Sequence, residues 1–260
     1  MPKCSQEITP IAPTANLFAV TVDNQLISIN TNDPSTILRS IPLRCVRSSH
    51  AILGIDFRPS TGQLYALIRT PGNIGKLYTI NVVNGAVKKV KSPLNFIPLN
   101  GTSFGVDFNP TVDRLRIVSN TGQNLRVDPN TGAVAFVDTN LTYPGGLIPS
   151  VVAAAYTNSF AGSTSTVLYD ISAGQNTLVT QNPPNSGTLN IVGTLGVTLD
   201  PNSPFTSFDI VSNSVSTNTA FASLALQNGT YGFYSINLAT GAATLINPAL
   251  NIPLRGIALL

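Results

Sequence analysis

Aspartate recurs at one position of a repeated motif, and carboxylates are the side chains here best suited to chemistry. Asp56, Asp107 and Asp209 stand in "GIDF", "GVDF" and "SFDIV", while the matching positions of two further copies hold Ala155 and Ala258. Carboxylate oxygens are ligands that Ca²⁺ prefers, so the three aspartates form a weak candidate metal site. The alternative is structural: each aspartate bonds backbone or hydroxyl groups within its own repeat, because buried carboxylates need partners. Their recurrence favours the structural interpretation, and we expect no required cofactor, with Ca²⁺ as the candidate ion.

Three arginines gather in one copy, within "DRLRIVSNTGQNLRVD", although only 10% of the chain is charged. Arg116 and Arg114 align with Tyr65 and Gln63 of the preceding copy. The position of Arg126 holds uncharged residues in the other copies, namely Ser28, Thr79, Val179 and Ser235. This copy has therefore gained charge where its siblings have none.

A guanidinium inside a β fold needs acceptors for its five donors, and the nearest carboxylates in sequence are Asp107, Asp113 and Asp128. One interpretation is a network of arginines and aspartates that ties neighbouring repeats together. The other is that Arg116 or Arg126 reaches a ligand and holds its carboxylate, sulfate or hydroxyl group. The structural interpretation is favoured, because paired charge within β folds is commonly architectural.

The candidate ligand-binding residues are those of the charged copy together with the single histidine and one tyrosine: Asp107, Arg114, Arg116, Asn124, Arg126, His50 and Tyr156. His50 lies in an irregular segment, "RCVRSSHA", but a lone histidine without a placed partner does not indicate a catalytic triad. We therefore assign no catalytic residues.

The elements that must position these residues are strands. Thr, Ser, Asn, Val and Ile dominate, glutamate occurs once, and 20 glycines and 19 prolines punctuate the 260 residues. That composition favours strands joined by tight turns over helices. One five-residue strand recurs as "LISIN", "LYTIN", "NLRVD", "TLVTQ" and "FYSIN", each followed by a turn that its terminal Asn, Asp or Gln can cap.

The repeat spacing predicts an all-β, five-bladed β-propeller with four antiparallel strands in each blade. The aspartate motif recurs at intervals of about fifty residues, which is typical of propeller blades. A tail over 1–15 precedes a single domain over 16–260, with blades at 16–43 plus 254–260, 52–92, 103–139, 151–194 and 206–248. The first blade has only three strands at the N-terminus, so the C-terminal "RGIALL" completes it and closes the ring. Deleting 256–260 should prevent folding, and a soluble truncation with an unchanged melting temperature would contradict the ring.

The loops that enter the innermost strands are long and irregular, so we expect binding at the mouth of the central channel. The expected partner is a small molecule, a glycan or a protein, with self-association as a further outcome. The run "KKVK" at 88–91 is typical of a solvated edge strand rather than a nucleic-acid patch. We expect no nucleic-acid partner and no transmembrane segment, because apolar runs stay well short of a membrane span.

Two cysteines, Cys4 and Cys45, are too few for a disulfide framework or a zinc site, and pair only if the protein is secreted. Sequons at Asn100, Asn140 and Asn228 fit an extracellular protein, although chance occurrence competes in a chain this rich in Asn, Ser and Thr. The N-terminus shows no apolar core of a signal peptide.

The motifs "GIDFRPSTGQLYAL", "FGVDFNPTVDRLRIVSNTGQNLRVDPNTGA", "VVAAAYTN" and "QNPPNSGTL" resemble those of the family catalogued as domain of unknown function 4394. The resemblance extends over nearly all of the chain from about residue 16. It implies a bacterial protein that is secreted or exported to the cell surface, and brings no established activity. We therefore predict a non-catalytic extracellular binding or assembly module, against the alternative of a hydrolase that uses channel carboxylates, with or without Ca²⁺.

Overall fold

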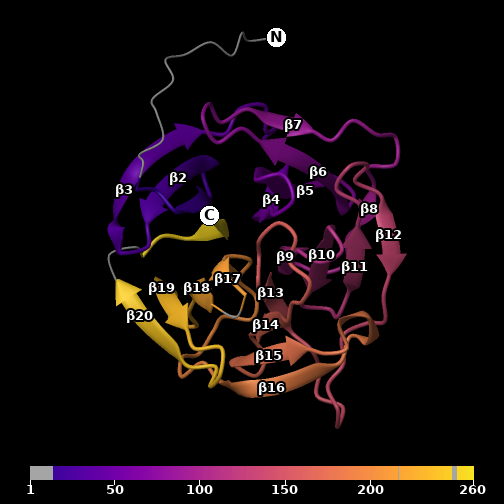
Figure 1. Ribbon diagram of the computed structural model, residues 1–260, viewed down its shortest axis with the longest axis vertical. Helices are drawn as coiled ribbons and strands as arrows, with labels where there is room; N and C mark the ends of the chain where they lie inside the picture. The colour runs from indigo at the N-terminus through magenta and orange to yellow at the C-terminus, as the bar shows by residue number, and fades with distance from the viewer. Residues whose placement is uncertain (1–13, 216, 248–250) are drawn as a thin grey trace.

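The computed structural model describes residues 14–215, 217–247 and 251–260, and shows five four-stranded antiparallel sheets arranged in a ring (Figure 1). The five-bladed propeller is thereby confirmed. The described residues contain no α-helix, only one 3₁₀ turn, η1, at Pro184–Ser186. None of their elements is a helix long and apolar enough to cross a bilayer.

Each blade has its innermost strand at the channel axis, and its other strands follow outward. Blade 1 contains β21 (Leu254–Leu259), β1 (Leu17–Thr21), β2 (Gln25–Asn30) and β3 (Asp33–Pro42). Blade 2 contains β4 (Ala51–Arg58), β5 (Gln63–Thr70), β6 (Ile74–Ile80) and β7 (Val87–Lys89), with β8 (Ile97–Pro98) also paired to β6. Blade 3 contains β9 (Phe104–Asn109), β10 (Arg114–Ser119), β11 (Asn124–Val127) and β12 (Val134–Val137). Blade 4 contains β13 (Val151–Tyr156), β14 (Leu168–Ser172), β15 (Thr177–Gln181) and β16 (Leu189–Thr194). Blade 5 contains β17 (Ser207–Ser214), β18 (Thr217–Ala225), β19 (Tyr231–Ile236) and β20 (Ala243–Asn247).

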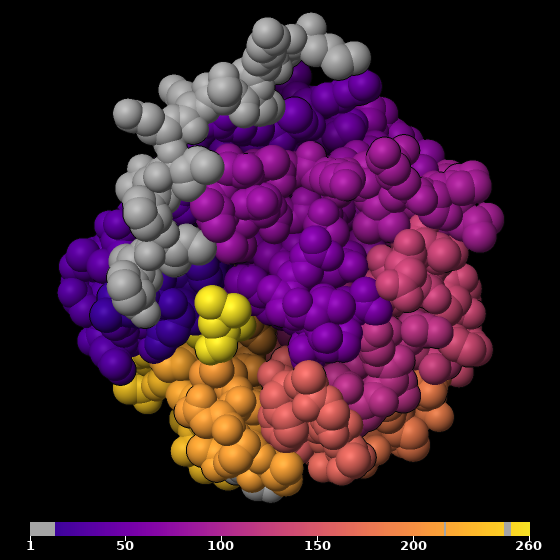
Figure 2. Space-filling model, turned by 45° about the horizontal axis from the view of Figure 1, so that its top comes forward, coloured from indigo at the N-terminus to yellow at the C-terminus, as the bar shows by residue number. Residues whose placement is uncertain are grey.

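The C-terminal strand closes the ring, as the incomplete first blade predicted. β21 pairs antiparallel with β1, with Leu259 opposite Leu17 and Ala258 opposite Phe18. Figure 2 shows the yellow C-terminal residues enclosed by segments of other blades. Closure gives β1 a hydrogen-bonded partner on each side, β21 and β2, and supplies blade 1 with its innermost strand.

The hydrophobic core is divided among the five junctions between blades. Five clusters of buried side chains are present, and each draws its members from two neighbouring blades. Aromatic pairs reinforce two junctions: Phe18 meets Phe57 edge-on at 5.5 Å between ring centroids, and Tyr65 meets Phe108 at 5.2 Å. Burial between blades therefore stabilises the ring as a whole.

Glycine permits the inner strands to approach closely. A Cβ on Gly105 of β9 would lie 2.6 Å from the backbone nitrogen of Ala154 in β13. On Gly54 of β4 it would lie 2.8 Å from Val106. Because any side chain there would separate neighbouring blades, these glycines keep the channel narrow.

The predicted turn caps are present after four third strands. Asn30, Asn81, Asp128 and Asn237 each accept a hydrogen bond from the backbone N–H two residues ahead. One alignment was wrong by a residue: Arg126 pairs with Arg116, and the equivalent pair in blade 4 is Thr180 with Tyr169. Thr180, not Val179, is therefore the counterpart of Arg126, because the sequence motif alone does not locate the pairing register.

Candidate functional site

The five inner strands begin at one face of the ring, which we call the top face. Residues at their starts line one small cavity on the axis, from Leu53, Phe104, Ala153, Thr206 and Arg255. Immediately beyond it along three of these strands lie Asp56, Asp107 and Asp209.

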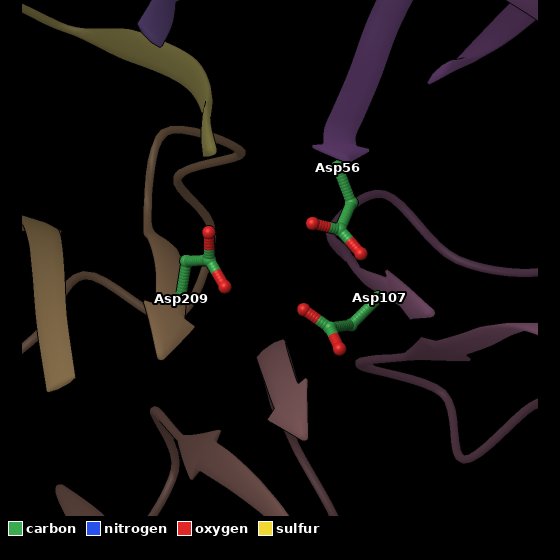
Figure 3. A group of neighbouring side chains, drawn as sticks. All are labelled: Asp56, Asp107 and Asp209. Atoms are coloured by element: carbon green, nitrogen blue, oxygen red, sulfur yellow. The ribbon is translucent and has the colours of Figure 1, made fainter. Parts of the chain in front are cut away.

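The three predicted channel aspartates converge on the axis (Figure 3). One carboxylate oxygen from each lies within 4.8 Å of those of the other two, and all three side chains are buried. Two oxygens bound to one Ca²⁺ at 2.3–2.6 Å are at most about 5 Å apart. The spacing therefore fits the metal ligand set predicted from the sequence, and Ca²⁺ binding stays a prediction.

Each of these carboxylates also joins two blades. The Oδ2 atom of Asp56 accepts a hydrogen bond from the N–H of Phe108 at 2.7 Å, and Oδ1 of Asp107 accepts from Tyr156 at 3.0 Å. Oδ2 of Asp209 accepts from Leu259 at 2.6 Å, across the closing junction. The prediction of backbone partners within the same repeat was wrong for these three bonds, which cross to the next blade. It was correct for Oδ1 of Asp209, which accepts a hydrogen bond from the N–H of Ile210 in its own strand at 2.6 Å.

Burial and mutual repulsion disfavour ionisation of the cluster. Burial and the charge of Asp209 raise the pKa of Asp56 well above its ordinary value, and burial with the charge of Asp56 does the same for Asp107. Burial raises the pKa of Asp209 to about 6, although its two backbone hydrogen bonds oppose the shift. Among the described residues, no arginine or lysine lies within ion-pair distance of the three aspartates. Protons or a bound cation must therefore balance the charge of their carboxylates.

Access to the cluster is restricted. The axial cavity above it measures about 10 Å³, which is room for roughly one water molecule. A sugar ring cannot reach the carboxylates through that opening in the described part of the chain.

The charged copy forms a bridge between blades 3 and 4. Arg116 is 1% exposed, and its Nε donates to the hydroxyl of Tyr156 at 3.1 Å. Its Nη1 donates to Asn124 at 2.7 Å and Asp138 at 2.6 Å, and its Nη2 donates to Asn185 at 2.8 Å. The other blades place Phe18, Tyr65, Tyr169 and Phe221 where blade 3 has Arg116. Arg116 therefore makes by hydrogen bonds a contact between blades that Phe18 and Tyr65 make with aromatic rings.

The partners of these arginines differ in part from those expected. Arg126 binds both oxygens of Asp138 at 2.8 Å and lies 4.0 Å from the centroid of the Phe136 ring. The expectation that Asp107, Asp113 or Asp128 would satisfy Arg116 and Arg126 was wrong, since β12 brings Asp138 beside both. Arg114 does contact Asp128, at 3.7 Å.

Asp113 binds Arg58 of the preceding blade instead. That ion pair joins blades 2 and 3 and lowers the pKa of Asp113, chiefly through the hydrogen bond from Arg58.

His50 lies apart from this network, in a pocket of about 370 Å³ on the top face. The pocket is formed by the loop before β4, by the hairpin between β5 and β6, and by the start of β21. Asn124, Tyr156 and the three predicted arginines are absent from its lining. Ligand binding by those residues stays a prediction, whereas the position of His50 at the mouth fits the expectation for that side chain.

Two arginines of this pocket, Arg69 and Arg255, were missed in the sequence. Both stand at strand ends on the top face, at the end of "QLYALIR" and the beginning of "RGIAL". The strand assignment could have placed both arginines at the same face, but only closure of the ring brings the C-terminal strand beside blade 2.

Asp170 of β14 was also missed. It is 0% exposed, neither carboxylate oxygen has a hydrogen-bond partner in the described residues, and burial raises its pKa to about 8. The matching positions in the other blades hold Ala19, Ala66, Ile117 and Ala222. An alignment of the five second strands would have shown that Asp170 is the one polar residue at a position where the other four blades have apolar residues.

The fold and this arrangement of charge define a closed five-bladed β-propeller with three buried aspartates on its axis. The model of the family described as "Domain of unknown function (DUF4394)" matches residues 25–258, and the chain belongs to that family. A search of curated proteins found no similar sequence.

Many solved structures are similar in fold. A putative exo-β-1,3-galactanase from Bifidobacterium bifidum aligns with a TM-score of 0.50 and 9% identity, over 90% of this chain and 84% of that one. Glutaminyl cyclase from Myxococcus xanthus aligns with a TM-score of 0.48 and 10% identity, over 93% and 97%. A chain of a nidogen/laminin complex aligns with a TM-score of 0.45 and 13% identity, over 94% and 97%. At such low identities the resemblance concerns the fold alone.

Proposed function

We propose that this protein is a non-catalytic binding module that takes a small molecule, a glycan or a segment of another protein at the channel mouth. The observation that carries the proposal is the top-face pocket of about 370 Å³, whose lining includes His50 and two arginines. Loops on a rigid scaffold are common places for recognition. The proposal includes an extracellular or cell-surface location, supported by the exposure of all three sequon asparagines, Asn100, Asn140 and Asn228.

The rival function is a hydrolase that uses the channel carboxylates. Their separation, within 4.8 Å between oxygens, is near that of a retaining glycosidase pair. Their burial beneath a cavity for one water weighs against it, because a substrate must touch the acid that protonates it. The geometry therefore favours binding over hydrolysis.

A blocked pocket tests the proposal. Ser49 is exposed and lines the pocket, so Ser49→Trp should fill it without disturbing the core. Val112 is 52% exposed in the turn after β9, at the opposite face, and Val112→Trp is the matched control. Both variants and the parent would be screened against an array of neutral and acidic glycans and by thermal shift against small metabolites.

We expect saturable binding by the parent and by Val112→Trp, loss of binding by Ser49→Trp, and ligand recovered chemically intact by mass spectrometry. Cleavage of a bound glycan would support the hydrolase. Equal binding by both tryptophan variants would place the site elsewhere. Oligomers by light scattering with no ligand bound would support an assembly role instead.

A further inference from the structure

The pocket beside the channel mouth contains two positive charges with no negative partner. Arg69 is the penultimate residue of β5, opposite Ala51, and Arg255 is the second residue of the closing strand β21. Within the described ranges, neither forms an ion pair and no carboxylate lines the pocket. Arg58, Arg114, Arg116 and Arg126, by contrast, are each paired with an aspartate.

Arg255 is held in this position by a local irregularity of the strand. Leu254 pairs with Thr21 and Gly256 pairs with Val20, so Arg255 is the extra residue of a β-bulge. Bulges redirect side chains and are frequent beside binding sites. Equivalent bulges in blades 2 and 4 hold the apolar residues Leu53 and Val152, so the arginine is particular to blade 1.

The guanidinium of Arg255 is incompletely satisfied. Its Nε atom is buried without a hydrogen-bond partner in the described structure, and its Nη2 makes only a long bond of 3.4 Å to the carbonyl of Val22. Burial and the neighbouring charge of Arg69 lower the pKa of Arg255. A buried donor and an unbalanced charge both cost stability, and an oxyanion between the two arginines would offset both.

We propose that Arg69 and Arg255 clamp an oxyanion group, a carboxylate or a sulfate, of a small molecule or glycan bound in this pocket. Guanidinium groups match the planar or tetrahedral array of such oxygens and bind them through paired hydrogen bonds. His50 and the hydroxyls of Ser48 and Ser49 line the same pocket and supply further donors. This inference rests on the proposed function and names the ligand class for that site.

The probes are galacturonate, its neutral methyl ester and inorganic sulfate, titrated calorimetrically at constant ionic strength. The variants are Arg69→Gln and Arg255→Leu. The second introduces leucine, the residue at the equivalent bulge of blade 2, Leu53. Arg47→Gln is the matched control, because Arg47 is an exposed arginine of the same loop that does not line the pocket. We expect galacturonate and sulfate to bind the parent, and each pocket variant to weaken both by about tenfold or more.

Further outcomes separate this inference from the proposed function. Arg69→Gln without probe should melt at or above the parent temperature, because it removes a repulsion, so a loss of binding cannot be ascribed to unfolding. If Arg47→Gln weakened the binding of galacturonate and sulfate as much as the pocket variants do, general electrostatic attraction would explain the binding, and the clamp would be overturned. Binding of the methyl ester as tight as that of galacturonate, abolished by Ser49→Trp, would overturn the anion inference and leave the binding module intact. No heat with any probe, together with an empty glycan screen, would overturn both.

Discussion

Two clusters of buried charge lie inside this ring, and they differ in how the charge is balanced. Between blades 3 and 4, Arg116 and Arg126 share Asp138 at hydrogen-bond distance. On the axis, Asp56, Asp107 and Asp209 face one another with no described cation at ion-pair distance. A balanced cluster holds blades together at any ordinary pH, whereas an unbalanced one depends on protons or cations from outside.

Breaking the balanced cluster should have the largest effect. Arg116→Leu removes four hydrogen bonds and leaves Asp138, Tyr156 and Asn185 with fewer partners between two blades. We expect a loss of about 3–5 kcal/mol in the free energy of unfolding, measured by urea denaturation.

Arg114→Leu is the control for that substitution. The side chain of Arg114 is 32% exposed and lies 3.7 Å from Asp128 of the same blade. We therefore expect the free energy of unfolding to fall by less than about 1 kcal/mol. Similar losses for both variants would mean that Arg116 does not brace the junction.

The unbalanced cluster should make stability depend on pH. The pKa values of these carboxyls are raised in the folded ring, to about 6 for Asp209, so above pH 4 the folded state holds protons that the unfolded chain releases. Stability should therefore fall as pH rises from 5 to 7, with Asp209 contributing up to about 1.4 kcal/mol per pH unit below its pKa of about 6 and less above it. Melting temperatures in EDTA across this range measure it.

Repeating these melting measurements with added Ca²⁺ tests whether the cluster binds the ion. If Ca²⁺ binds the ionised carboxylates, millimolar Ca²⁺ should restore the melting temperature at pH 7 and have little effect at pH 5. Asp209→Asn should reduce both the pH dependence and any calcium effect. A flat profile from pH 5 to 7 in EDTA would show that the cluster is balanced by some other means.

A smaller and opposite effect is expected at Asp170. Asp170→Ala introduces alanine, which blades 1, 2 and 5 have at the matching position. It removes a buried carboxyl with no hydrogen-bond partner among the described residues. We expect a gain of about 1–3 kcal/mol at pH 7, measured by urea denaturation. Asp170→Asn, which keeps a polar group in place, should gain less. A loss in both variants would indicate that the carboxyl has a partner such as an internal water.

A modest loss is expected for Arg126→Ser, which introduces the serine found at the equivalent positions Ser28 and Ser235. Arg126 is 19% exposed, and Asp138 keeps Arg116 as a partner when Arg126 is removed. We expect a loss of about 1 kcal/mol, seen as a melting temperature lowered by a few degrees. A fall as large as that of Arg116→Leu would mean that the two arginines act as one unit.

The architecture could be predicted because its signals are local and repeated. The spacing of Asp56, Asp107 and Asp209, and the recurring third strands, indicated the blades, and the short first blade indicated closure by the C-terminus. The convergence of the aspartates was one of two open interpretations, because a repeated position can point to the axis or into its own blade. Asp138 lies beyond the motif that contains the arginines, and the pairing of β12 with β11 brings it beside Arg116 and Arg126.

The sequence alone therefore determined the strands, their order and the ring, since alternation and turn chemistry act between near neighbours along the chain. Only the tertiary structure decided which charges meet. The Arg69–Arg255 pocket joins residues that are far apart in the chain, and its position depends on ring closure and on one bulge. The face that a strand residue occupies changes with a shift of one residue, and that shift is settled by packing between blades.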